Sequence, residues 1–175
     1  HAQVVRNGWG GRTGLFHHFL AQEGFLVFSL DNRGSTARGR NFERALLGRL
    51  GKTELADQLA GVKWLSQQPF VDATRLGIWG WSYGGYMTLY ALTHSNAFRA
   101  GAAVAPVTDW RLYDTIYTER YLKLPSDNPE GYKESSPIFA AQDLQAALFL
   151  AHGTGDDNVH WQNTLNFIAE LIKAG

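Results

Sequence analysis

The apolar and polar positions of the chain alternate between two spacings, one typical of helices and one typical of buried strands. Helical spacing occurs at 15–20, 55–65, 84–93 and 161–174. Short, nearly continuous apolar runs, which suit strands buried on both faces, occur at 25–30, 76–79, 100–105 and 147–151. This alternation predicts an α/β fold built on a mostly parallel sheet.

The same pattern predicts one domain. The chain has 175 residues, and a domain takes roughly 100 to 200. A polar and aromatic stretch, 106–143, interrupts the alternation, and we expect it to face a substrate. Because the chain opens on His1 and closes on Gly175 at the end of a predicted helix, we also expect it to be a segment of a longer protein.

Composition and charge exclude several classes of function. Sixteen basic residues balance sixteen acidic ones, so nothing favours a nucleic-acid partner. No apolar run approaches the roughly 18 residues of a membrane span. The absence of cysteine removes thiol nucleophiles and thiolate metal sites but leaves the compartment open. We find neither metal-ligand spacing nor a phosphate-binding glycine motif, and therefore expect no metal and no cofactor.

Residues 80–84 read Gly-Trp-Ser-Tyr-Gly, which fits the Gly-x-Ser-x-Gly pattern of serine hydrolases. In that pattern a strand turns sharply into a helix and presents the serine hydroxyl at the turn. An apolar strand is predicted before this motif and a helix of small residues after it, as that chemistry requires. We therefore predict that Ser82 is a nucleophile. The alternative is a glycine-rich turn in which Ser82 only caps the helix.

A serine nucleophile needs an imidazole base oriented by a carboxylate, and in hydrolases the acid and then the histidine follow the serine along the chain. Asp156 and its neighbour Asp157 lie just after the predicted strand 147–151 and are the favoured acids. Asp109, just after the strand 100–105, faces the same sheet edge and is a further rival. Each could instead be a turn aspartate that bonds its own backbone.

None of the six histidines fits the role of the base. Four of them precede the acid, namely His1, His17, His18 and His94. His152 ends a predicted strand. His160 begins a predicted helix and is too close in the sequence to Asp156 to be its usual partner in a triad. We expect each to be structural and the base to lie beyond Gly175.

Three separated motifs resemble the dipeptidyl peptidase IV branch of the prolyl oligopeptidase family. They are Gly-Trp-Ser-Tyr-Gly-Gly-Tyr-Met at 80–87, Tyr-Thr-Glu-Arg-Tyr at 117–121, and His-Gly-Thr-Gly-Asp-Asp-Asn-Val-His at 152–160. The likeness runs through nearly the whole chain. It implies an α/β-hydrolase fold, a mostly parallel sheet with helices on both faces, here incomplete at both ends. Residues 1–175 would then be part of a peptidase domain, with a propeller domain upstream and a histidine-bearing segment downstream.

The resemblance also implies an activity and a site. The activity is that of a serine peptidase that releases N-terminal dipeptides after proline or alanine through an acyl-enzyme. Asp156 becomes the acid, the backbone N–H of Tyr83 an oxyanion donor, and Asn158 a contact to a substrate carbonyl. The resemblance makes five residues walls of the proline pocket: Val107, Trp110, Tyr113, Tyr117 and Val159. Aromatic faces and valines suit a compact apolar ring, although such a cluster could also be core alone.

Other implied parts fall outside the sequence. The second oxyanion donor, a tyrosine, would precede His1, on a strand lying between 25–30 and 76–79. The acidic pair that binds the free amino terminus of a substrate would belong to the propeller.

Leu112 stands where relatives often carry an aromatic residue. The resemblance favours a periplasmic or secreted location and allows a homodimer of the full-length protein. Residues 1–175 alone should be inactive and poorly soluble.

Three alternatives to a dipeptidyl peptidase stay open. One is another peptidase of the same family, an oligopeptidase or acylaminoacyl peptidase. Another is a non-catalytic interaction domain on the same fold, although such relatives typically lose the serine that this chain keeps. The third is a generic esterase, which hydrolysis of dipeptidyl-proline against short-acyl ester substrates would separate.

Overall fold

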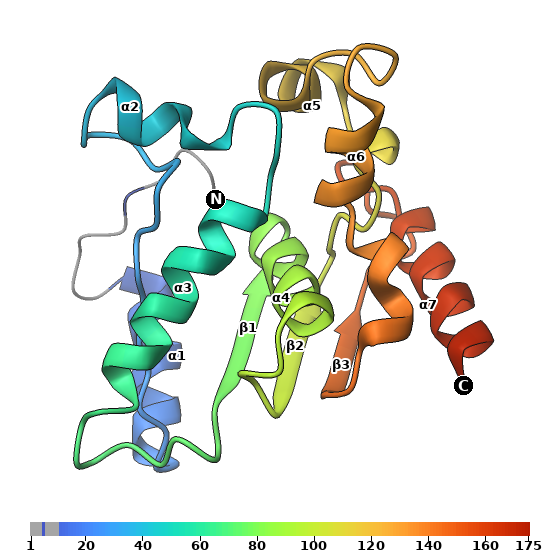
Figure 1. The fold of residues 1–175 in the computed structure, drawn as a ribbon. Coiled ribbons are helices and arrows are strands. Elements are labelled where there is room, and N and C mark those ends of the chain that lie inside the picture. The colour runs from blue at the N-terminus through green and yellow to red at the C-terminus, as the bar shows by residue number, and fades with distance from the viewer. Residues whose placement is uncertain (1–4, 6–10) are drawn as a thin grey trace.

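A computed structural model describes residue 5 and residues 11–175, and a parallel sheet lies at its centre (Figure 1). The strands β1 (Gly77–Trp81), β2 (Ala100–Val104) and β3 (Ala147–Ala151) pair in the order β1-β2-β3. Both pairings are parallel, and Ala102 lies between Trp79 and Phe149 in the register. Three of the four predicted strands are thereby confirmed. Their carboxyl ends share one edge, where α/β proteins place their ligands.

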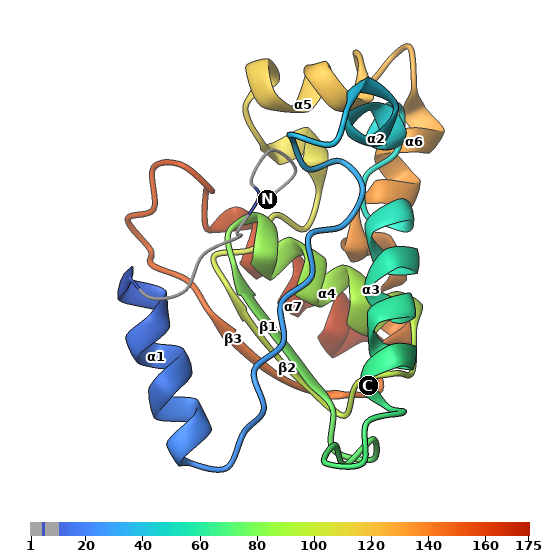
Figure 2. The ribbon, with the colours of Figure 1, turned by 90° about the vertical axis from the view of Figure 1, so that its left-hand side faces the viewer.

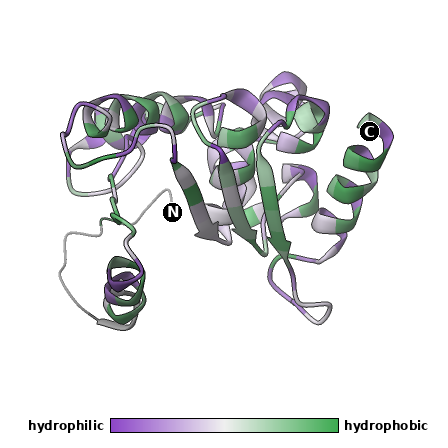
Figure 3. Cartoon of the chain, turned by 90° about the horizontal axis from the view of Figure 1, so that it is seen from below, coloured by the Kyte–Doolittle hydropathy of each residue, from purple (hydrophilic) through white to green (hydrophobic). Residues whose placement is uncertain are grey.

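Helices cover both faces of this sheet, as predicted (Figures 2 and 3). On one face lie α3 (Lys52–Leu65), α4 (Tyr83–His94) and α7 (Gln162–Ala174), and on the other α1 (Gly11–Gln22). Leu89 of α4 and Phe167 of α7 are fully buried against Ala103 of β2. On the opposite face, the ring of Phe16 packs edge-on against Trp79 with centroids 5.3 Å apart.

The predicted strand at 25–30 is wrong, because this segment has no strand structure. It runs beside α3, where the ring of Phe28 stacks on Trp64 at 5.8 Å and the carbonyl of Leu30 accepts a hydrogen bond from the Gln58 side chain. In the described part of the chain no strand borders it, so its backbone has no ladder to join. An apolar run alone does not make a strand.

The remaining segments are short helices and turns. Between α1 and α3 lie α2 (Arg40–Glu43) and η1 (Arg44–Leu46). The predicted excursion at 106–143 folds as η2 (Trp110–Leu112), α5 (Thr115–Leu122), α6 (Pro129–Ser135) and η3 (Pro137–Asp143). Figure 1 shows α5 and α6 beyond the carboxyl ends of the strands. Among the described helices, none is both long and apolar enough to cross a membrane.

Candidate active site

Ser82 forms the turn between β1 and α4, and the structure confirms the predicted strand-to-helix junction. Its φ of 58° and ψ of −118° lie in a region that residues other than glycine rarely adopt, at a cost of about 1–3 kcal/mol. The backbone N–H of Ser82 donates to the carbonyl of Val104 at 2.9 Å, and its carbonyl accepts from Tyr86 at 2.9 Å. These bonds hold a partly exposed serine in a strained conformation.

Close backbone packing explains two of the glycines around Ser82. A Cβ atom on Gly80 would collide with the backbone of Gly84, and one on Gly85 would lie 2.6 Å from the carbonyl oxygen of Val104. The strand, the turn and the helix can therefore approach only if both positions lack a side chain. A Cβ atom on Gly84 would meet nothing within 4 Å, so the second glycine of the motif is not needed for space.

Asp156 lies in the loop after β3, with its carboxylate held by that loop. Its Oδ1 accepts the backbone N–H groups of Asn158 and Val159, each at 3.0 Å. Its Oδ2 lies 3.5 Å from Nε2 of His152. Asp156 is half-buried, whereas its rival Asp157 is exposed. The loop thus fixes one carboxylate at the carboxyl edge of the sheet, which carries Ser82 as well.

His152 is buried beneath this loop, and its ring nitrogens have partners. Nε2 lies 2.7 Å from the carbonyl oxygen of Val159, and Nδ1 lies 2.6 Å from the hydroxyl of Thr164. A carbonyl and a carboxylate can only accept, so Nε2 carries a proton, while Nδ1 pairs with a hydroxyl that can donate or accept. These contacts agree with the expected structural role of His152.

Two further histidines, His160 and His94, contact residues that are close to them in the sequence. Nδ1 of His160 accepts the backbone N–H of Gln162 at 3.3 Å. His94 stacks on Tyr90 with ring centroids 4.0 Å apart, and burial lowers its pKa. His17 and His18 lie on α1, and His1 lies outside the described residues. The base stays a prediction for a segment beyond this sequence.

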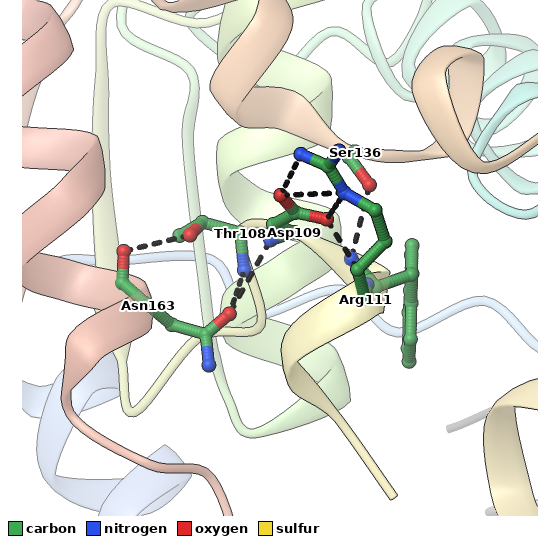
Figure 4. A network of polar contacts seen from close by, with 6 residues as sticks. Thr108, Asp109, Arg111, Ser136 and Asn163 are labelled. Carbon is green, nitrogen blue, oxygen red and sulfur yellow. Dashed lines mark hydrogen bonds and ion pairs between the residues drawn. The ribbon is translucent and has the colours of Figure 1, made fainter. Parts of the chain in front are cut away.

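The carboxylate of Asp109, the other rival acid, is hydrogen-bonded to the nearby Arg111 (Figure 4). Its carboxylate accepts the guanidinium of Arg111 at 2.5 and 2.9 Å and the backbone N–H of Arg111 at 3.0 Å. The amide oxygen of Asn163 accepts the N–H groups of Thr108 and Asp109, while the hydroxyl of Thr108 donates to the Asn163 carbonyl at 2.7 Å. Asp109 therefore caps η2 in a buried network, an arrangement that disfavours it as the catalytic acid.

The aromatic residues predicted as pocket walls do come together. Trp110 stacks on Tyr117 at 6.0 Å, and Tyr113 packs edge-on against both at 5.9 and 5.5 Å. Val107 and Val159 are buried in the same cluster. Tyr113 and Tyr117 keep partly exposed surfaces. Part of the cluster is therefore open to solvent, and its use as a substrate pocket stays a prediction.

Asn158 connects this cluster to the loop of Asp156. Its amide oxygen accepts the hydroxyl of Tyr113 at 2.9 Å. Since the amide oxygen is engaged, the two N–H groups are the donors with which Asn158 can bind a carbonyl oxygen. Asn158 is exposed, so a substrate can reach it.

Sequence reasoning missed Glu54, a fully buried acid beside the serine turn. One oxygen of Glu54 accepts the hydroxyl of Tyr83 at 2.5 Å, and the other accepts the backbone N–H of Gly51 at 2.8 Å. Burial raises the pKa of Glu54 and raises the pKa of Tyr83 well above its ordinary value. A glutamate in the first turn of a helix that follows a glycine was the only signal, and it indicated no more than a cap.

The described residues include no cluster of three or more histidine and acidic side chains that could hold a metal ion. A surface groove of about 380 Å³ lies beside α3 and is lined in part by Phe28, Asp57 and Trp64. None of the predicted site residues lines this groove.

Comparison with known proteins is consistent with this geometry. The sequence profile of the prolyl oligopeptidase family matches residues 15–175. The protein named "Probable dipeptidyl-aminopeptidase B" in Aspergillus oryzae is 47% identical over 160 residues, which are 89% of this chain and 18% of that protein. "Probable dipeptidyl peptidase 4" of Aspergillus clavatus is 38% identical over 180 residues, 99% of this chain and 23% of that protein.

A solved structure shows the same likeness. Dipeptidyl peptidase 4 of Porphyromonas gingivalis superposes with a TM-score of 0.89 at 48% identity, over 91% of this chain and 23% of that one. The chain thus spans about a fifth of the length of the relatives it matches. Together with the parallel sheet and its helices, the superposition confirms the predicted α/β-hydrolase fold.

Proposed function

Because this chain belongs to the prolyl oligopeptidase family, we propose that it carries the serine and the acid of a serine-type dipeptidyl peptidase. The observation that carries the proposal is the strained Ser82 between β1 and α4, on the same sheet edge as the loop that holds Asp156. A capping serine would not require a positive φ, whereas a nucleophile that must project from a turn does.

The proposed reaction follows the serine acyl-transfer route. The Oγ atom of Ser82 attacks the carbonyl carbon of the second substrate residue while a histidine accepts its proton. The backbone N–H of Tyr83 donates to the resulting oxyanion. The histidine then protonates the departing amine, and water releases the dipeptide from the acyl-enzyme by the reverse sequence. Asp156 orients that histidine, which we place in a segment after Gly175.

The proposed substrates are peptides with proline or alanine at the second position. Support comes from the aromatic cluster of Trp110, Tyr113 and Tyr117, which offers flat apolar faces near the turn. Val107 and Val159 add apolar surface to the same cluster. Asn158 would bind a peptide carbonyl through its free amide donors. We further propose an upstream propeller domain and a homodimer of the full-length protein.

The decisive experiment is Ser82→Ala in the full-length peptidase. We expect hydrolysis of a glycyl-prolyl chromogenic amide to fall by at least about 1,000-fold, since triad members act as a unit. A fluorophosphonate probe should label the wild type and leave the variant unlabelled. If the variant keeps near-normal turnover, the serine mechanism is wrong. A wild type that hydrolyses only short-acyl esters would instead identify an esterase.

A further inference from the structure

Tyr83 is held at both ends by different parts of the molecule. Tyr83 is the first residue of α4, and its backbone directly follows the strained Ser82. Its hydroxyl donates to Glu54, which lies 29 positions earlier on α3. Glu54 has no exposed surface, and its other oxygen accepts the N–H of Gly51. The side chain of Tyr83 is thus anchored to α3, a helix that carries none of the predicted site residues.

The ring between these two anchors contacts the proposed pocket. It packs 5.9 Å from the ring of Trp110 and 6.4 Å from that of Tyr117, measured between centroids. Only about 5% of Tyr83 is exposed, so the ring is enclosed by this cluster. The Tyr83 ring therefore forms the buried side of this aromatic cluster.

The two anchors control different parts of Tyr83. Its backbone N–H is positioned by α4 and by the hydrogen bonds on either side of Ser82. Its hydroxyl lies at the far end of the side chain, where Glu54 is the acceptor. Loss of the Glu54 contact would remove the anchor at the hydroxyl end of the ring and leave the backbone in the helix. The contact should then affect substrates that fill the pocket and spare those that do not.

We propose that Glu54 is a positioning residue that fixes the Tyr83 ring as the inner wall of the substrate pocket and so sets the preference for prolyl substrates. The inference rests on the proposed function, because it assigns a role within that pocket. Glu54 does not touch the substrate; it acts through Tyr83.

Variants of Glu54 and Tyr83 can keep or remove the hydrogen bond between them selectively. Glu54→Gln can keep both links, because its amide oxygen can accept from Gly51 while its amide N–H donates to the Tyr83 hydroxyl, which also accepts. Glu54→Leu fills a similar volume without either link. Tyr83→Phe removes a single oxygen atom and keeps the ring. Asp57→Asn is a matched control, since Asp57 lies on the same helix and pairs with Arg33 away from the site.

The experiment compares kcat/KM for a glycyl-prolyl amide and for a short-acyl ester in the full-length peptidase. For Glu54→Leu and Tyr83→Phe we expect the ratio of amide to ester activity to fall about tenfold or more, the usual scale for an imperfect apolar pocket. The loss should be mainly in KM. Glu54→Gln should keep the ratio within about threefold of wild type, and Asp57→Asn should leave it unchanged.

Equal losses on both substrates in Glu54→Leu and Tyr83→Phe would overturn the inference, because a purely structural role lowers all activities alike. If Glu54→Leu fails to fold, Tyr83→Phe decides alone. An unchanged ratio in an enzyme that still depends on Ser82 rejects the role of Glu54 and leaves the proposed function standing. A wild type with no activity on the prolyl amide would reject both.

Discussion

Two loops leave neighbouring strands at the same edge of the sheet, and each carries an aspartate that accepts backbone hydrogen bonds. In the loop after β2, the carboxylate of Asp109 forms an ion pair with the guanidinium of Arg111. In the loop after β3, Asp156 is held by two backbone N–H groups, and its nearest side-chain partner is His152 at 3.5 Å. Both aspartates follow the end of a strand, but their carboxylates have different hydrogen-bond partners.

That difference separates a structural acid from a candidate catalytic one. A carboxylate that already binds a guanidinium through both oxygens has little capacity left for a histidine. A carboxylate positioned by peptide N–H groups can still accept a further strong donor, because each oxygen has two acceptor sites. The comparison therefore favours Asp156 and predicts unequal effects when each acid is altered.

The largest expected effect is that of Asp156→Asn. An amide cannot hold a histidine in the required tautomer, so kcat on a glycyl-prolyl amide should fall by about 10⁴-fold in the full-length peptidase. Asp157→Asn, the adjacent control, should stay within a few-fold of wild type. A loss in the Asp157 variant that equals the loss in the Asp156 variant would show that the acid has been misassigned.

A smaller loss is expected when the support beneath the Asp156 loop is removed. His152→Phe keeps a planar ring but leaves the carbonyl of Val159 and the hydroxyl of Thr164 without their partner. The loop should shift, and kcat should fall by about 10- to 100-fold, the scale expected for a small displacement of a catalytic group. His152→Gln, which can still donate to Val159, should recover most of the activity. Failure of that recovery would argue that the ring, rather than its donor, matters.

In the other loop we expect a change in stability rather than in catalysis. Asp109→Asn weakens the cap of η2 and the pair with Arg111, whose side chain is 55% exposed. Because solvent screens that pair, the loss in the free energy of unfolding should be about 1 kcal/mol. The thermal midpoint should drop by a few degrees while kcat stays within about threefold. A collapse of kcat without a change in the midpoint would reverse our comparison of the two loops.

A buried carboxyl whose hydrogen-bond donors are a phenol and a backbone N–H should respond to pH in the opposite sense to a carboxyl paired with a base. This effect is the smallest that we predict. Burial raises the pKa of Glu54 in the folded protein above its ordinary value of 4.5. As pH rises above 4.5, the unfolded chain loses this proton first, so the free energy of unfolding decreases until the pKa in the folded state is passed.

Thermal midpoints measured across this pH range test the prediction with Glu54→Gln as the reference. The variant cannot ionise, so its midpoint should gain on that of the wild type as pH rises. The pKa values of Tyr83 and Tyr86 are raised well above 10.0, so these phenols do not titrate in this window. A difference between variant and wild type that stays constant with pH would show that Glu54 is not destabilised by burial.

The sequence was sufficient for the elements whose pattern is local. The run at 147–151 gave β3 with its observed bounds, and the glycine-flanked Ser82 gave the turn into α4. It failed at 25–30, because a strand depends on a neighbour that the run itself does not specify. The choice between Asp109 and Asp156 also depended on partners distant in sequence, of which Asn163 is an example. Glu54 was missed for the same reason.

The positive φ of Ser82 has an implication for how the chain can change over generations. Glycine adopts this conformation without penalty, so Ser82→Gly would relieve the turn of the strain that serine carries there. That replacement would also delete the hydroxyl on which the proposed chemistry depends. The most stabilising residue at this position is then an inactivating one, and continued selection for activity is needed to keep the serine. In a copy released from that selection, drift toward glycine or another small residue at position 82 should be among the earliest changes.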